Sequence, residues 1–195
     1  MLLKDYIPKI DKKFFFSGIC FDSSKIKKNN IFFAIKGNNI DGNDFILAAI
    51  KKGAKIIITE KKIKSPPDGV KFIQVKNIRK LLAQISFKIQ KNVPKNLIAV
   101  TGTNGKSSIA DFYFQILKLN NKNVASIGTL GVKSNSLNLN LSNTTTDPIQ
   151  LGEILAKLKK HKVDNVIMEA SSHGLKQNRL DGLVFNSGIF TNLSQ

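Results

Sequence analysis

The chain has 195 residues, of which 42% are hydrophobic and 8% aromatic. This composition can bury a core, so it excludes a wholly disordered protein, and the length predicts one large domain or two small ones. No apolar run approaches the roughly 20 residues of a membrane-spanning helix. The amino terminus lacks a signal-peptide core and the single Cys20 cannot form an internal disulfide, so we expect a reducing cytoplasm and no membrane insertion.

The charge balance, 31 basic against 13 acidic residues or a net +18, invites a nucleic-acid-binding interpretation. Only Arg79 and Arg179 are arginine, however, and arginine is the residue that makes bidentate contacts with phosphate and guanine. The abundant Lys, Asn and Ile are typical of an AT-rich coding bias. We therefore expect no nucleic-acid partner, and keep a basic, non-enzymatic nucleic-acid-binding module as an alternative.

A polar segment broken by a proline at residues 91–96 divides the chain. Residues 1–94 are expected to form a small α/β domain, because strand-like apolar runs alternate with stretches of helical spacing. Strands are expected at residues 14–20, 31–35, 54–59 and 71–75, helices at 45–52 and 78–90, and a loop at 65–69.

Residues 95–195 alternate more regularly, which predicts a phosphate-loop domain with a mainly parallel sheet and an overall α/β class. Strands are expected at residues 97–101, 124–129, 163–169 and 184–190, and helices at 107–119 and 149–160. Ligands of such sheets lie beyond the carboxyl ends of the strands, so the residues that follow each strand are the candidate site.

The first such segment, Gly102 to Ser108, reads Gly-Thr-Asn-Gly-Lys-Ser-Ser between a predicted strand and a predicted helix. Its two glycines allow a tight turn of backbone N–H groups, and the helix N-terminus adds partial positive charge. Lys106 is expected to reach the terminal phosphates of a nucleotide, and the Ser107 hydroxyl to bind Mg²⁺. Val100 stands where the strict motif has its first glycine, so a glycine-rich helix cap remains the alternative.

Polar residues also follow the later strands. Glu169 ends an apolar strand and is expected to be the second magnesium ligand. His173 either orients Glu169, approaches a phosphate or has a structural role. Asp147-Pro148 fits a helix N-cap as well as a site, and Arg179 fits an anionic substrate group.

Together these residues resemble the Mur ligases of peptidoglycan synthesis. The resemblance covers nearly the whole chain. It rests on Gly102 to Ser108, Asn143 to Thr145, Met168 to Leu175 with Gln177 and Arg179, and residues 190–195, and in the first half on Phe21 to Ser24, Ile31 to Ala34, Gly37 and Asp41-Gly42.

The resemblance implies an ATP- and Mg²⁺-dependent ligase that forms a carbon–nitrogen bond. Its substrates would be UDP-N-acetylmuramoyl-L-alanyl-D-glutamate, activated as an acyl phosphate, and a third amino acid, with meso-diaminopimelate as the default. It also implies that the chain is an amino-terminal part of such an enzyme, a monomer that does not turn over alone. Folylpolyglutamate-type ligases and other P-loop enzymes remain alternatives.

The resemblance assigns a role to each matching residue. Lys106, Glu169 and His173 would be catalytic, with Ser107 and Glu169 on Mg²⁺. ATP would be bound by Gly102, Thr103, Asn104, Gly105, Lys106, Ser107 and Ser108. The UDP-linked substrate would be bound by Phe21, Ser23, Asn38, Asn39, Ile40, Asn143, Thr144, Thr145, Ser171, Gln177 and Arg179.

Overall fold

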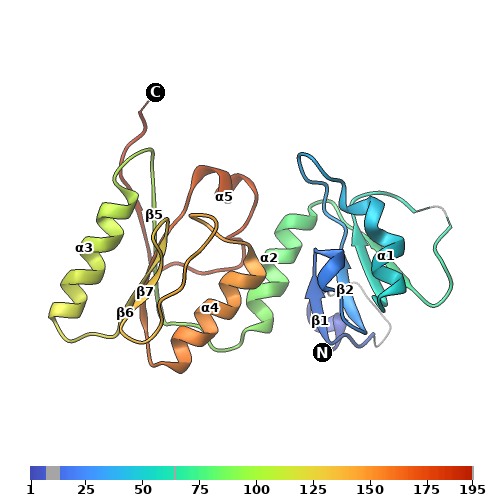
Figure 1. Ribbon diagram of the computed structural model, residues 1–195, viewed down its shortest axis with the longest axis horizontal. Helices are drawn as coiled ribbons and strands as arrows, with labels where there is room; N and C mark the ends of the chain where they lie inside the picture. Colours follow the sequence, from blue (N-terminus) through green and yellow to red (C-terminus); the bar gives the residue numbers. More distant parts are fainter. Residues whose placement is uncertain (8–13, 64, 195) are drawn as a thin grey trace. The chain divides into compact units, whose positions relative to one another are not determined.

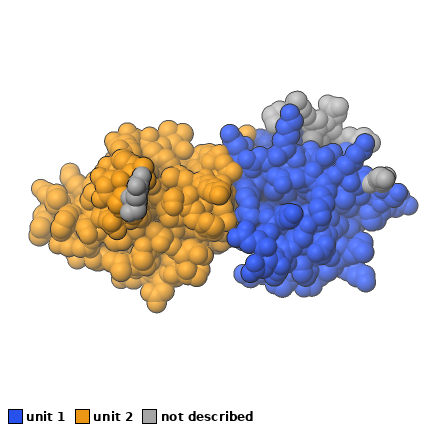
Figure 2. All heavy atoms as spheres, turned by 90° about the horizontal axis from the view of Figure 1, so that it is seen from above, with its two compact units in different colours: residues 1–85 blue, residues 86–195 orange. Residues whose placement is uncertain are grey.

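The computed structural model describes residues 1–7, 14–63 and 65–194 (Figure 1). The chain divides into two compact units, Met1–Ile85 and Ser86–Gln195 (Figure 2). The expected domain boundary at residues 94 and 95 stays a prediction. Gln195, which closes the last family-like stretch, and residues 8–10 of the amino-terminal segment lie outside the described residues. Within the described part of the chain, no helix is long and apolar enough to cross a bilayer.

Unit 1 contains a four-stranded parallel sheet in the order β1-β2-β3-β4. Short helices occupy the connections, and α2 begins in unit 1 and ends in unit 2. The elements are η1 (Leu3–Asp5), β1 (Gly18–Cys20), η2 (Ser23–Lys25), β2 (Asn30–Phe33), η3 (Gly42–Phe45), α1 (Ile46–Lys51), β3 (Ile56–Thr59), β4 (Lys71–Gln74) and α2 (Ile78–Ile89).

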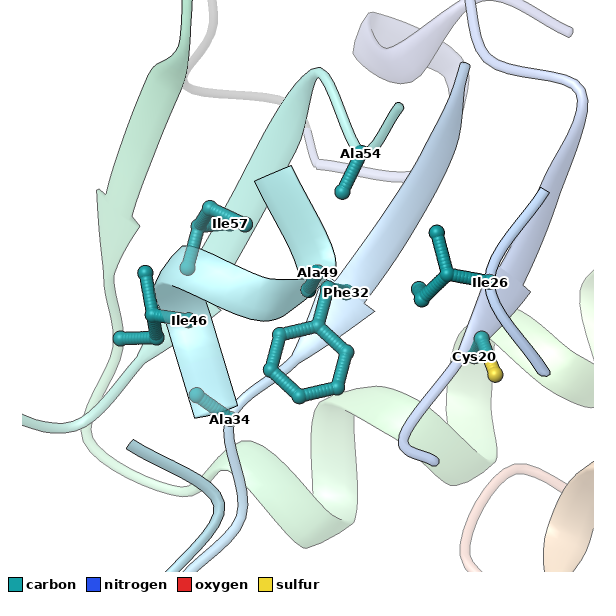
Figure 3. Close-up of a cluster of buried hydrophobic side chains, with 8 residues drawn as sticks. All are labelled: Cys20, Ile26, Phe32, Ala34, Ile46, Ala49, Ala54 and Ile57. Carbon is teal, nitrogen blue, oxygen red and sulfur yellow. The ribbon is translucent and has the colours of Figure 1, made fainter. Parts of the chain in front are cut away.

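The two central strands of this sheet are buried along their whole length, as parallel strands covered on both faces require. Side chains alternate between the faces, and Phe32 and Ile57 point into a cluster with Ile46 and Ala49 of α1 (Figure 3). The intervening residues of β2 and β3 are equally buried. The sequence has continuous apolar runs at β2 and β3 because both faces of these strands are buried.

The strand expected at residues 14–20 is shorter than predicted. The parallel ladder with β2 begins only at Gly18, opposite Asn30. Just before it, Asn29 has a left-handed backbone (φ 63°) and its carbonyl accepts from Ser17, so a turn ends the regular pairing. Phe15 instead makes an isolated antiparallel bridge with Leu2.

Unit 2 contains a five-stranded, mainly parallel sheet in the order β7-β6-β8-β5-β9, which confirms the predicted α/β class. The only antiparallel pair among the described strands is β6 with β7. The elements are β5 (Asn96–Thr101), α3 (Lys106–Leu119), β6 (Val124–Gly128), β7 (Gly131–Ser134), α4 (Pro148–Lys160), β8 (Asn165–Glu169), α5 (Ser172–Lys176) and β9 (Ser187–Phe190).

Helices α3 and α4 cover opposite faces of this sheet (Figure 1). From β5 the chain passes through α3 to β6, which lies on the far side of β8. After the β6–β7 hairpin it returns through α4 to β8, between β6 and β5. Crossovers that run in opposite directions with the same handedness lie on opposite faces. The carboxyl ends of β5, β6, β8 and β9 consequently meet at one edge of the sheet.

Three features of unit 2 differ from the sequence expectation. The antiparallel β7 and the short α5 have no counterpart among the predicted elements. The last strand begins at Ser187 rather than at residue 184, because Val184 is exposed and the Asn186 side chain accepts from the Leu97 amide ahead of the ladder. The four-residue β7 pairs with β6 as a hairpin across the two-residue turn at residues 129–130, and the sequence interpretation did not separate it from the loop that follows.

Candidate active site

The loop from Gly102 to Gly105 joins β5 to α3 at the carboxyl edge of the second sheet. Gly102 and Gly105 both have positive φ angles, 135° and 83°, which L side chains adopt only with strain. Gly105 is the N-cap of α3, so the first-turn amides of this 14-residue helix face the loop. The glycine turn and the positive end of the helix therefore lie together after β5, as the sequence predicted.

The segment after β9 packs directly against this loop. The Thr103 and Asn104 amides donate to the Asn192 backbone oxygen (3.0 Å) and to its Oδ1 atom (3.1 Å). The Thr191 hydroxyl donates to the Asn104 carbonyl (2.6 Å), and the Ser194 amide donates to the Thr103 hydroxyl (3.1 Å). We call residues 191–194 the loop brace. It holds Thr103 and Asn104 in the middle of the loop, and leaves the first-turn amides of α3 to face a ligand.

Lys106 lies at the start of α3 with its ammonium group folded back over the loop. Its Nζ atom donates to the carbonyls of Gly102 (2.7 Å) and Thr103 (3.0 Å). The positive charge therefore already lies at the mouth of the loop. An anionic ligand there would exchange carbonyl partners for phosphate oxygens, which are stronger, charged acceptors.

Glu169, at the end of β8, is almost fully buried, with 3% of its surface exposed. Both of its carboxylate oxygens accept hydrogen bonds from Thr129, which directly follows β6. Glu169 and Ser107 line one small cavity between α3 and the β6–β7 hairpin. The structure thus brings together the two residues that the sequence proposed as magnesium ligands.

The chemistry of this cavity suits a hard cation. A hydroxyl and a carboxylate oxygen are ligands that Mg²⁺ prefers, and Mg²⁺ usually completes its shell with water and substrate phosphates. Within the described ranges no cluster of three or more His, Cys, Asp or Glu residues is present, so the protein alone offers few ligands. Asp111 also lines the cavity, but the Lys133 ammonium donates to it (2.7 Å) and holds the pKa of that carboxyl below its usual range.

Thr145 and Ser171 brace the far side of Glu169. The buried Thr145 hydroxyl donates to the Glu169 backbone carbonyl (2.9 Å) and accepts from the Ser171 amide (3.0 Å). The Ser171 hydroxyl caps α5 by accepting from the Gly174 amide (3.0 Å). Both residues therefore have structural partners beside the substrate role proposed for them.

Arg179, Gln177 and His173 form a second polar group next to Thr145. The Arg179 guanidinium donates to the Gln177 amide oxygen from Nε (3.1 Å) and Nη2 (2.8 Å), and from Nη1 to the Thr145 carbonyl. Gln177 Nε2 lies 2.8 Å from His173 Nε2. The bonds to the Glu169 carboxylate come from Thr129 rather than from His173.

The remaining substrate candidates, Asn143 and Thr144, lie in the loop before α4, and Thr144 is only partly exposed. Asn143 is exposed and donates to the Ser142 hydroxyl (3.3 Å), while the Thr144 hydroxyl lies 3.0 Å from that of Thr129. Asp147 caps α4 as the alternative interpretation expected, accepting from the amides of Ile149 and Gln150.

The nucleotide candidates of unit 1 lie at the carboxyl edge of its own sheet. Phe21 and Ser23 follow β1, and the loop 38–40 follows β2, its neighbour. Backbone bonds from Gly37 to the Ile40 carbonyl (2.8 Å) and from Gly42 to the Ile35 carbonyl (2.9 Å) close this loop. Ile40 and Phe21 expose 64% and 39% of their surfaces, which leaves two apolar side chains at an edge where ligands of parallel sheets lie.

Family models match both parts of the chain. Residues 100–195 match the Mur ligase middle domain, and residues 16–88 match the model described as "Mur ligase family, catalytic domain". The chain belongs to the Mur ligase family. The resemblance drawn from the phosphate loop and the segment around Glu169 is thereby confirmed.

Proteins named UDP-N-acetylmuramoyl-L-alanyl-D-glutamate–2,6-diaminopimelate ligase are among the relatives of this Mur ligase chain. That of Rickettsia felis is 40% identical over 182 residues, which cover 91% of this chain and 34% of the relative. That of Bradyrhizobium diazoefficiens is 40% identical over 181 residues, covering 92% and 36%. A solved structure with the same name has a TM-score of 0.86 and 28% identity, covering 100% of this chain and 41% of that one. The chain spans less than half the length of these relatives.

The sequence interpretation gave no site role to four residues that contact the site: Gly128, Thr129, Thr191 and Asn192, although the last two lie in the family-like stretch 190–195. Gly128 ends β6 and Thr129 follows it, while Thr191 and Asn192 follow β9, so each lies at the edge where ligands of a parallel sheet are expected. Their position at the carboxyl end of a strand was the signal in the sequence that could have identified them. Their contacts with Glu169 and with the loop are visible only in the folded chain.

Proposed function

We propose that this chain provides the UDP-substrate-binding part and the first part of the ATP-binding domain of a ligase. The reaction proposed is the addition of diaminopimelate to UDP-N-acetylmuramoyl-L-alanyl-D-glutamate in peptidoglycan synthesis. Support comes from the two relatives named as UDP-N-acetylmuramoyl-L-alanyl-D-glutamate–2,6-diaminopimelate ligases, each of which is 40% identical to this chain. The observation that carries the proposal is the convergence of Lys106, Ser107 and buried Glu169 at one sheet edge.

The chemical demand of such a reaction is to bring an anionic carboxylate to an anionic γ-phosphate. Lys106 and the first-turn amides of α3 would hold the triphosphate, since fixed positive charge in a preorganised site lowers the cost of that approach. Ser107 and Glu169 would hold Mg²⁺, which when bound supplies further positive charge beside the phosphates. His173 is retained as a proposed catalytic residue, held by Gln177.

The muramoyl dipeptide would be bound by the polar residues beside Glu169. Arg179 fits this role because two partners fix the plane of its guanidinium, so little side-chain entropy would be lost on binding a carboxylate. Phe21, Ser23 and residues 38–40 would bind the uridine nucleotide in unit 1. The remaining proposed contacts are those of Asn143, Thr144, Thr145, Ser171 and Gln177.

We expect ligand binding rather than complete turnover from these 195 residues, because the relatives are more than twice as long. A domain boundary at residues 94 and 95, a monomeric state and a cytoplasmic location also belong to this proposal. The single free Cys20, which favours a reducing compartment, supports the proposed cytoplasmic location.

Isothermal titration of the 195-residue chain with a non-hydrolysable ATP analogue tests the proposal. We expect Mg²⁺-dependent binding that weakens at least tenfold in Lys106→Ala, because the ammonium group at the loop mouth is lost. Lys122→Ala is the matched control, since it removes the same charge from an exposed position beyond the end of α3. Equal affinities in the two variants, or no heat with the unsubstituted chain, would contradict the ATP site.

The same titration separates the alternatives. UDP-N-acetylmuramoyl-L-alanyl-D-glutamate should bind saturably, whereas a folate should not. A steep loss of affinity for nucleic acid with rising salt, in place of UDP-substrate binding, would instead support the basic binding module.

A further inference from the structure

Thr129 makes two hydrogen bonds to the same carboxylate. Its backbone amide donates to Glu169 Oε1 (3.1 Å), and its hydroxyl donates to Glu169 Oε2 (3.0 Å). Donors to an ionised carboxylate form charge-assisted bonds, which are shorter and stronger than neutral ones. One residue directly after the neighbouring strand β6 therefore fixes both the position and the rotation of this buried group.

The residue before it makes this arrangement sterically possible. The β6–β8 register pairs Ile127 with Met168, so Gly128 lies opposite Glu169. A Cβ atom on Gly128 would lie 2.6 Å from Glu169 Cγ and closer still to the carboxylate. The Glu169 side chain thus crosses over Gly128 to reach Thr129, and Gly128 and Thr129 act as a pair.

Thr129 also connects Glu169 to a substrate candidate. The hydroxyls of Thr129 and Thr144 lie 3.0 Å apart. Because the single hydroxyl hydrogen of Thr129 goes to Glu169, Thr144 is the donor in this contact. The chain of donors then runs from Thr144 through Thr129 to Glu169, and each bond polarises the next.

We propose that Thr129 is a positioning residue that orients the Glu169 carboxylate toward a divalent cation held with the nucleotide. This inference rests on the proposed function, because Glu169 is a metal ligand only within it. Partners that orient a ligating carboxylate typically contribute 10–100-fold in metal affinity. Thr129 itself stays exposed at its turn, so its replacement leaves the core of unit 2 intact.

The test compares Thr129→Val with Thr129→Ser in the 195-residue chain. Valine keeps the shape and the backbone donor but removes the hydroxyl, whereas serine keeps the hydroxyl. The affinity for a non-hydrolysable ATP analogue is measured with Mn²⁺ and with EDTA, and the ratio of the two is the metal-dependent gain. We expect Thr129→Val to reduce this gain about 10–100-fold and Thr129→Ser to restore it, with the metal-free affinity unchanged in both.

A second comparison uses Glu169→Gln, in which Thr129→Val should have no additional effect on the gain. Unchanged gain in Thr129→Val, equal losses in both Thr129 variants, or a parallel loss of metal-free affinity would overturn the inference while leaving the nucleotide site in place. A chain that binds no nucleotide at all would overturn the proposed function, and this inference with it.

Discussion

Replacing Gly102 with alanine tests the packing of the loop brace on the phosphate loop. Gly102 has φ 135°, a conformation in which a non-glycine residue costs about 1–3 kcal/mol. Its added Cβ atom would lie 2.8 Å from the Asn192 carbonyl oxygen and closer still to the Thr191 hydroxyl. Such overpacking against backbone costs a further ~1–3 kcal/mol. We therefore expect Gly102→Ala to lower the free energy of unfolding of unit 2 by about 2–6 kcal/mol.

Two glycines of the same unit provide matched controls. Gly105 also has a positive φ, but the nearest atom to an added Cβ is Thr191 Cγ2 at 4.0 Å, so Gly105→Ala isolates backbone strain of about 1–2 kcal/mol. Gly188, in β9, has no atom within 4 Å of an added Cβ and no positive φ, so Gly188→Ala should be neutral or slightly stabilising. Urea unfolding measures the free energy of unfolding of all three variants, and the slope of its dependence on urea concentration should be the same in each. If Gly102→Ala and Gly105→Ala are equally destabilising, the brace does not pack on the loop as described.

Two further predictions concern helix capping and pH. Asp147→Ala removes the acceptor of two first-turn amides of α4, each 3.0 Å away, and should cost about 1 kcal/mol of stability in urea unfolding; a change indistinguishable from zero would contradict the cap. The hydrogen bond from Lys61, followed by those from Asn43, holds the pKa of Asp41 well below its usual range. A depressed pKa stabilises the folded state above the unfolded value of about 4 and loses that contribution as pH falls below it. The urea midpoint of the unsubstituted chain should therefore fall more steeply between about pH 4 and 2 than that of Asp41→Asn, and parallel curves would contradict this assignment.

The site shows how a parallel sheet assembles chemistry from separate segments. The phosphate loop follows β5, Thr129 follows β6, the segment around Glu169 closes β8, and the loop brace follows β9. Neighbouring parallel strands end at the same edge, so residues far apart in the chain meet there. In this Mur ligase chain, the strand order is what places a carboxylate beside the helix N-terminus.

The sequence alone was sufficient for features that depend on local pattern. The burial of β2 and β3, the helices α3 and α4, and the glycines of the phosphate loop all follow from apolar periodicity and backbone freedom within a few residues. Glu169 could be singled out because a carboxylate at the end of a buried apolar strand is unusual. These signals are short-range, and the predicted fold class and the family resemblance were based on them.

Only the tertiary structure revealed which groups hold those residues in place. Thr129 contacts Glu169 across 40 positions in the sequence, and Asn192 contacts Asn104 across 88. The fit of Glu169 over Gly128 likewise depends on the register between β6 and β8. No local preference encodes such contacts, because they arise when strand order and packing bring distant backbone and side-chain groups within hydrogen-bond distance.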